Sequence, residues 1–155
     1  MSSIAVDIYS KKMIRNFEQQ DMDHVVRIWL EGSLIAHNFI PEEYWKGKSK
    51  EMREIYLPSS KTFVYENREL LGFISIKDNY IAALFVDPKE QGKGIGKQML
   101  AFVKHLYPSL ELNVYTENLN SVAFYKKQGF VILEENIEED TGRKEYKMRY
   151  ISEIQ

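Results

Sequence analysis

The chain has 155 residues, of which 44% are hydrophobic and 13% aromatic, enough to form the core of one globular domain. Its formal net charge of −2 argues against a protein that binds nucleic acid through bulk charge. The sequence contains no cysteine, which excludes disulfides, thiolate zinc sites and a cysteine nucleophile, and which suits a cytoplasmic protein.

The N-terminus has neither the basic start nor the apolar core of a secretory signal. We interpret residues 1–12 as an N-terminal extension or a tag, and residues 13–151 as a single domain. The longest apolar run, residues 80–86, is too short to cross a bilayer, so no membrane association is expected.

The first predicted elements are a strand at residues 13–17 and a helix at residues 21–32, which Gly32 is expected to end. A second helical stretch begins at Pro41, which suits the first turn of a helix, and runs to residue 57. Three strands joined by short turns then predict an antiparallel meander, at residues 61–66, 70–77 and 80–87.

A glycine-rich loop follows, and beyond it helices and strands alternate. The apolar residues of the next helix are expected to lie on one helical face: Ile95, Met99, Leu100, Val103 and Leu106. The remaining predicted elements are a strand at residues 110–115, a helix at residues 118–128 ended by Gly129, and a closing hairpin of residues 130–140 and 143–151. The strand–helix–strand unit implies one parallel pair, so the predicted fold class is α/β of the α+β type, a mostly antiparallel sheet flanked by helices.

The glycine-rich loop lies in the segment LFVDPKEQGKGIGKQML, residues 84–100, between a predicted strand and a predicted helix. Its glycines are Gly92, Gly94 and Gly96. Amides at a helix N-terminus bind anions, and glycine lets a phosphate approach the backbone closely. A P-loop is disfavoured because Gln91 replaces its first glycine, and a Rossmann loop because Lys97 replaces its third.

The spacing of Gln91, Gly94 and Gly96 gives Gln-x-x-Gly-x-Gly, which resembles the acyl-CoA signature of the GCN5-related N-acetyltransferases, the GNAT family. A second segment, NSVAFYKKQGF at residues 120–130, resembles the other hallmark of that family. The resemblance covers residues 13–150.

Two further segments, AHNFIPEEYW at residues 36–45 and AALFVDP at residues 82–88, resemble a bacterial GNAT subgroup that includes protein-lysine acetyltransferases. The resemblance implies an acetyl-CoA-dependent N-acetyltransferase without a metal, in which an amine attacks the thioester directly in a ternary complex. The implied acceptor is a protein lysine or a small amine.

A GNAT-like sheet would contain a splayed parallel strand pair with the pantetheine arm in the gap between the strands. By resemblance, the residues expected at acetyl-CoA are Leu84, Phe85, Val86, Gln91, Gly92, Lys93, Gly94, Ile95, Gly96, Lys97, Asn120, Ala123 and Tyr125. Asn120 also fits the N-cap of its helix. The loop lysines, with Lys89, Lys126 and Lys127 nearby, suit the CoA phosphates, although each also fits a solvated surface.

Tyr125 resembles the family tyrosine that protonates the departing CoA thiolate, and its alternative is a core tyrosine with a hydrogen-bonded hydroxyl. The acceptor amine needs a general base, and the candidates are His37, Glu42, Glu43 and Tyr80. The expected catalytic residues are therefore Tyr125, Tyr80 and His37.

Two alternative functions stay open: a non-catalytic acyl-CoA sensor, and an acetyltransferase for antibiotics or polyamines. The acidic run at residues 134–140 fits either attraction of a cationic acceptor or a solvated hairpin face. Neither a nucleic acid nor a membrane is an expected partner, and both a monomer and a homodimer are compatible with the sequence.

Overall fold

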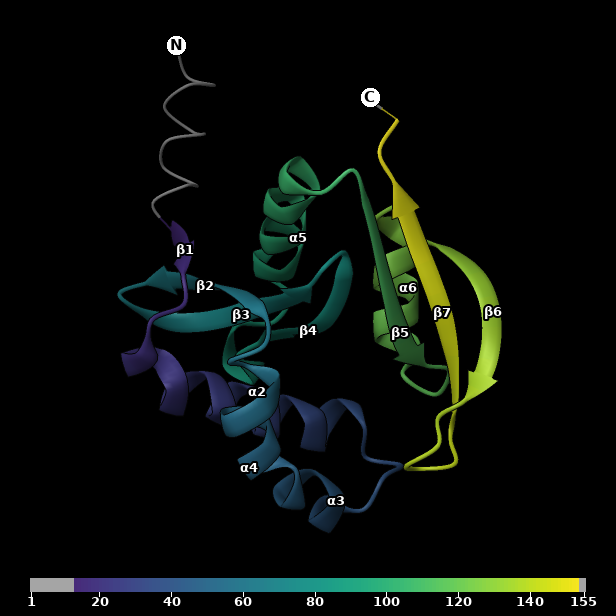
Figure 1. Ribbon diagram of the computed structural model, residues 1–155, viewed down its shortest axis with the longest axis horizontal. Helices are drawn as coiled ribbons and strands as arrows, with labels where there is room; N and C mark the ends of the chain where they lie inside the picture. The colour runs from purple at the N-terminus through teal and green to yellow at the C-terminus, as the bar shows by residue number, and fades with distance from the viewer. Residues whose placement is uncertain (1–12, 154–155) are drawn as a thin grey trace.

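Seven strands form one sheet in the order β1-β2-β3-β4-β5-β7-β6 in the computed structural model, which describes residues 13–153 (Figure 1). The strands are β1 Ile14–Asn16, β2 Lys61–Asn67, β3 Glu69–Lys77, β4 Tyr80–Val86, β5 Ser109–Tyr115, β6 Val131–Ile137 and β7 Lys144–Ile151. Every neighbouring pair is antiparallel except β4 and β5, which confirms the predicted fold class. The predicted extension, residues 1–12, lies outside the described residues.

Helices cover both faces of this sheet (Figure 1). The longer helices are α2 Met22–Ala36, α5 Ile95–Leu106 and α6 Leu119–Lys127. Shorter helical segments are η1 Gln19–Asp21, α3 Glu42–Gly47, α4 Ser49–Glu51, the π-helical η2 Met52–Tyr56 and η3 Pro88–Glu90. None of the helices within residues 13–153 combines the length and the apolar character needed to cross a membrane.

Two hydrophobic clusters form the core, one on each side of the sheet. On one side Met99 and Leu100 of α5 pack with Tyr125 of α6 and with strand residues such as Leu110 and Met148. On the other side, residues of α2 and α3 pack against residues of β2 and β3. The helices supply Val25, Ile28, Trp29 and Trp45, and the strands supply Val64 and Phe73. Alternate strand residues therefore point into different clusters, as expected for a sheet that is buried on both faces.

The parallel pair of β4 and β5 is joined at one register position only, where Tyr80 lies opposite Glu111. The amide of Glu111 also donates to the carbonyl of Asn79 at 2.9 Å. Farther along, β4 keeps its antiparallel partner β3, with Leu84 opposite Ile74 and Phe85 opposite Phe73, but has no partner on the β5 side among the described residues. The sheet is therefore splayed between β4 and β5.

The expectation that Gly32 ends the first helix is wrong. Gly32 does not end its helix, because α2 continues to Ala36. The glycine is instead needed for close packing: a Cβ atom at this position would lie 2.7 Å from Cδ1 of Phe85. In α5, Ile95, Met99, Leu100 and Val103 are buried, whereas Leu106, its last residue, is 52% exposed.

We expect the substitution Gly32→Ala to lower the free energy of unfolding by about 1–3 kcal/mol, the usual cost of overpacking a core. The aromatic ring of Phe85 would have to move, since the clash is with its body and not with a flexible chain end. Chemical denaturation of the purified variant measures this loss.

Gly47→Ala is the matched control, because Gly47 also lies in a helix but a Cβ atom there would meet nothing within 4 Å. Its stability should stay level or rise by up to about 1 kcal/mol. Equal losses in both variants would contradict the close-packing explanation for Gly32.

Candidate functional site

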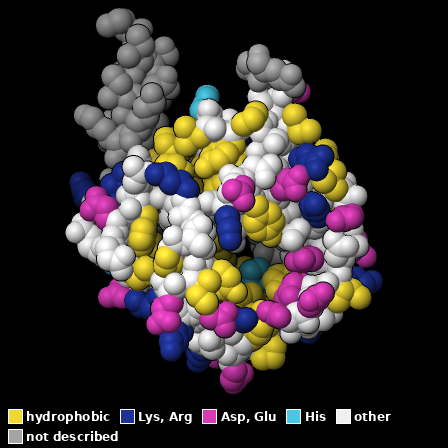
Figure 2. Space-filling model, viewed as in Figure 1, with side chains coloured by type: hydrophobic (Ala, Val, Ile, Leu, Met, Phe, Trp, Pro, Cys, Tyr) yellow, Lys and Arg dark blue, Asp and Glu magenta, His cyan; other side chains and the backbone are white. Residues whose placement is uncertain are grey.

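A cavity of about 920 Å³ lies where β4 and β5 separate, and α2, α6 and the glycine-rich loop complete its walls. Figure 2 shows the molecule hollowed near the centre of the face in view, with acidic side chains gathered to one side of the hollow. The predicted site residues that line the cavity are His37, Tyr80, Leu84, Phe85, Val86, Gln91, Gly92, Gly94, Ile95, Gly96, Lys97, Asn120 and Tyr125. The structure thus brings together residues from four separate stretches of the chain.

Several other candidates lie outside this cavity. Lys93 is 63% exposed and pairs with Glu90 at 2.6 Å, and Ala123 is exposed on α6. Glu42 and Glu43 are exposed on α3, where Glu42 pairs with Lys46. The two glutamates are therefore poorly placed to act as bases at the cavity.

The glycine-rich loop leads directly into the N-terminus of α5. Gly92 and Gly94 have φ angles of 82° and 84°, in the left-handed region that only glycine adopts readily, and Gly94 is the N-cap of the helix. Gly96 has an ordinary backbone conformation, and a Cβ atom there would lie 3.7 Å from both Phe124 and Val86. The loop therefore presents bare backbone at a helix N-terminus, which suits an anion.

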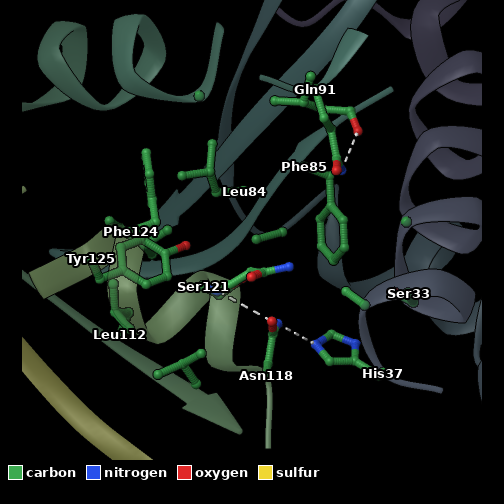
Figure 3. A pocket seen from close by; sticks show the side chains of 18 of the residues that line it. Ser33, His37, Leu84, Phe85, Gln91, Leu112, Asn118, Ser121, Phe124 and Tyr125 are labelled. Atoms are coloured by element: carbon green, nitrogen blue, oxygen red, sulfur yellow. Dashed lines mark hydrogen bonds between the residues drawn. The ribbon is translucent and has the colours of Figure 1, made fainter. Parts of the chain in front are cut away.

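The N-terminus of α6 lies at the opposite side of the cavity from the loop residue Gln91 (Figure 3). The predicted cap, Asn120, is wrong: Asn118 is the N-cap, and its side-chain oxygen accepts from the amide of Ser121 at 3.3 Å. Asn118 is buried, whereas Asn120 lies within the first turn of α6 and still lines the cavity. The sequence NLN offers both residues, and only Asn118 is buried and contacts His37.

Tyr125 extends from α6 with its ring packed against Phe124 and Phe130, at centroid distances of 5.3 and 5.5 Å. Figure 3 shows its hydroxyl directed into the cavity. No hydrogen bond joins this hydroxyl to another side chain within residues 13–153, so the alternative of a hydrogen-bonded core tyrosine is not what the structure contains. Burial raises the pKa of Tyr125 above its usual value, and the phenol is therefore protonated at neutral pH.

His37 follows the last residue of α2 and is enclosed by aromatic rings. It stacks on Trp45 with centroids 5.1 Å apart and meets Tyr115 edge-on at 5.1 Å. Its Nε2 atom lies 3.3 Å from the side-chain nitrogen, Nδ2, of Asn118 (Figure 3). Its Nδ1 atom is buried without a hydrogen-bond partner among the described residues. Burial lowers the pKa of His37 to about 4, which makes the ring neutral and a weak base at pH 7.

Tyr80 of β4 and Glu145 of β7 both line the cavity and lie close enough to interact electrostatically. Burial raises the pKa of Tyr80, and the negative charge of Glu145 adds to this effect. Glu145 lines the cavity from β7, directly across from Tyr115 of β5. Glu145 is not among the residues expected from the sequence, although the alternation of Tyr146, Met148 and Tyr150 toward the core places it on the opposite face.

The cavity offers two lysines, Lys97 of α5 and Lys127 of α6, besides the backbone of the loop. Lys89 and Lys126 are exposed and do not line it. Within the part of the chain that the structure describes, no three His, Asp or Glu side chains are grouped as metal ligands would be. The arrangement suits a long phosphate-bearing ligand that ends beside the hydroxyl of Tyr125.

The chain matches the family model described as "Acetyltransferase (GNAT) domain" over residues 9–151. It is 36% identical, over 124 residues, to peptidyl-lysine N-acetyltransferase YiaC from Escherichia coli K12, and the match covers 79% of this chain and 85% of that protein. The solution structure of apo-form YjaB from Escherichia coli is similar with a TM-score of 0.79 and 26% identity, covering 90% of this chain and 97% of that chain.

A structure of the PaiA N-acetyltransferase from Thermoplasma acidophilum in complex with coenzyme A has a TM-score of 0.75 to this chain. The identity is 19%, and the match covers 90% of this chain and 98% of that one. At this identity the likeness concerns the fold alone.

Proposed function

The chain belongs to the GNAT family of acetyltransferases, and we propose that it transfers the acetyl group of acetyl-CoA to the ε-amine of lysine in a protein or peptide. The observation that carries this proposal is the cavity in the splayed sheet, which joins the glycine-rich helix N-terminus to the hydroxyl of Tyr125. The acceptor class is supported by the peptidyl-lysine N-acetyltransferase that is 36% identical to this chain over 124 residues.

The acetyl-CoA pyrophosphate is assigned to the amides around Gly94 and Gly96, where the α5 dipole favours a negative charge. The pantetheine arm is assigned to the gap between β4 and β5, where the backbone of Leu84–Val86 pairs with β3 on one side only. An extended amide chain in that gap would complete the hydrogen bonds of the strand.

The acceptor nitrogen attacks the thioester carbonyl, the new C–N bond forms, and the C–S bond breaks. Tyr125 is assigned to protonate the departing sulfur, since its hydroxyl points into the cavity and keeps its proton at neutral pH. A thiol and a phenol have ordinary pKa values of about 8.5 and 10. Burial raises both, so the transfer remains roughly balanced.

The lysine amine must lose a proton before it attacks, because at pH 7 only about one part in 10³ is neutral. His37 is a poor base for this step, since burial lowers its pKa to about 4. We therefore assign His37 to the wall of the acceptor side, where it stacks on Trp45. Tyr80 lies where β4 and β5 meet and lines the cavity, and we assign it to contact the acceptor.

The test is a screen in which release of free CoA is measured with lysine-containing peptides, polyamines and aminoglycosides. We expect release with the peptides, and mass spectrometry should locate the acetyl group on lysine. Release with polyamines or aminoglycosides alone would make the chain a small-molecule acetyltransferase. Binding of acetyl-CoA without release for any acceptor would favour the sensor.

The double substitution Lys97→Gln and Lys127→Gln should weaken acetyl-CoA binding about tenfold at low salt, because each lysine lines the cavity. Salt screens such contacts, so the affinity of the variant should also depend less steeply on ionic strength. Calorimetric titration at several salt concentrations measures both effects.

Lys126→Gln is the control, since Lys126 is adjacent on α6 but does not line the cavity. Lys93 is left unchanged because it already pairs with Glu90. The same salt dependence in the double variant and the parent would indicate that both lysines are only solvated surface residues.

A further inference from the structure

Glu145 differs from the other charged side chains of the cavity. The charged residues that line the cavity are Glu90, Lys97, Lys127 and Glu145. Glu90 is neutralised by Lys93 at 2.6 Å. Within residues 13–153, Glu145 is the one cavity carboxylate that has neither an ion pair nor a hydrogen bond to another side chain.

The sheet places Glu145 on the side where an acceptor would enter. In the pairing of β5 with β7, Glu145 lies directly across from Tyr115, whose ring contacts His37. The neighbouring residue Tyr146 points to the opposite face and packs against the cluster that contains Tyr125. The carboxylate of Glu145 and the hydroxyl of Tyr125 therefore reach the cavity from opposite faces of the splayed sheet.

The other carboxylates near this face already have partners. Glu138 accepts from the hydroxyl of Tyr115 at 3.1 Å and from Thr141, and Asp140 lies 3.3 Å from the ammonium nitrogen of Lys48. They contribute negative potential at the rim, but their oxygens are engaged. Glu145 is the carboxylate that remains available for a group that enters from outside.

We propose that Glu145 binds the ammonium group of the acceptor, and that it makes the site selective for cationic side chains. This inference rests on the proposed function, because it assigns the residue that recognises the acceptor of that reaction. A partly buried carboxylate without a cation is unfavourable, and a lysine ammonium would supply the missing charge and a charge-assisted hydrogen bond.

The electrostatics of the site agree with this assignment. Burial raises the pKa of Glu145, and the nearby charge of Glu138 raises it further, so the carboxylate lacks compensation in the protein itself. Lys144 pairs with Glu135, and Lys147 pairs with Glu111, so neither neighbouring lysine on β7 supplies that compensation.

The experiment measures binding to the full chain saturated with CoA, which allows the acceptor to bind without turnover. The probes are two N-terminally acetylated pentapeptides that differ only in a central lysine or norleucine, so that only the ammonium is varied. The parent should bind the lysine peptide about tenfold more tightly. In Glu145→Gln the ratio of the two affinities, lysine peptide over norleucine peptide, should fall to about one. The affinities for CoA and for the norleucine peptide should be unchanged.

Two further variants separate charge recognition from structure. Glu145→Asp keeps the charge and should retain part of the ratio. Glu135→Gln removes the same charge from the same hairpin outside the cavity and should retain all of it. A general loss of folding would lower every affinity, including that for CoA, and would not change the ratio selectively.

A ratio in Glu145→Gln equal to that of the parent would overturn the inference, and so would a parent that does not distinguish the two peptides. These outcomes are separable from failure of the proposed function. If the parent acetylates lysine peptides but substitution of Glu145 leaves the affinity ratio unchanged, only the inference is overturned. If the parent prefers the lysine peptide through Glu145 but releases no CoA from acetyl-CoA in its presence, only the proposed reaction is overturned.

Discussion

Replacing Tyr125 with phenylalanine is expected to lower turnover about 100-fold and to leave the affinity for acetyl-CoA nearly unchanged. The substitution keeps the ring that packs against Phe124 and Phe130 and removes only the hydroxyl that points into the cavity. An interaction made mainly in the transition state affects turnover and not the binding of the substrate. Initial rates and calorimetric titration on the same preparation measure the two quantities.

The stability of the Tyr125→Phe variant should not fall, because the hydroxyl has no hydrogen bond to another side chain within the described residues. Tyr150→Phe is the matched control: Tyr150 also packs against Phe130, but it does not line the cavity. Its turnover should equal that of the parent. Normal turnover in Tyr125→Phe would remove Tyr125 from the mechanism and would point to water as the proton donor.

The second large effect is expected from Gly94→Val, which should weaken acetyl-CoA binding about 100-fold while the fold persists. Gly94 has a φ of 84° at the N-cap of α5, where a branched side chain both strains the backbone and covers the amides that would hold the pyrophosphate. Calorimetric titration measures the affinity, and circular dichroism verifies that the variant is folded.

Gly142→Val separates strain from ligand contact, because Gly142 has a similar φ of 72° in the hairpin between β6 and β7 and does not line the cavity. Both variants should lose about 1–2 kcal/mol of stability, but only Gly94→Val should lose affinity. Gly96→Ala is a milder change of the same loop, because the added Cβ atom would lie 3.7 Å from the nearest side chains. Normal affinity for acetyl-CoA in both Gly94→Val and Gly96→Ala would show that the phosphates bind elsewhere.

The order of the helices and strands was predictable because each depends on local patterns. The apolar runs of β2 and β3, the glycine-rich loop before α5 and the left-handed Gly129 after α6 all act within a few residues of the sequence. Tyr125 and the loop glycines could be found in the same way, since their motifs are contiguous.

The errors concern contacts between segments that are distant in sequence. Gly32 looks like a helix stop until Phe85, which is far away in the chain, is found to occupy the space of its side chain. Asn118 and Asn120 are equally good caps in isolation, and contact with His37 distinguishes them. Glu145 lies in a run of charged residues, and only the pairing of β7 with β5 shows that it lines the cavity.

The single register pair between β4 and β5 has a consequence for how such a protein can change over evolutionary time. In the proposed complex, acetyl-CoA is held by main-chain groups of Leu84–Val86, which every residue except proline provides, so these hydrogen bonds do not depend on the identity of the side chains. In the same complex the acceptor meets side chains instead, among them His37, Tyr115 and Glu145, and replacing one of them would alter what is recognised. A new acceptor could then be acquired by point mutation while the main-chain contacts to acetyl-CoA are kept.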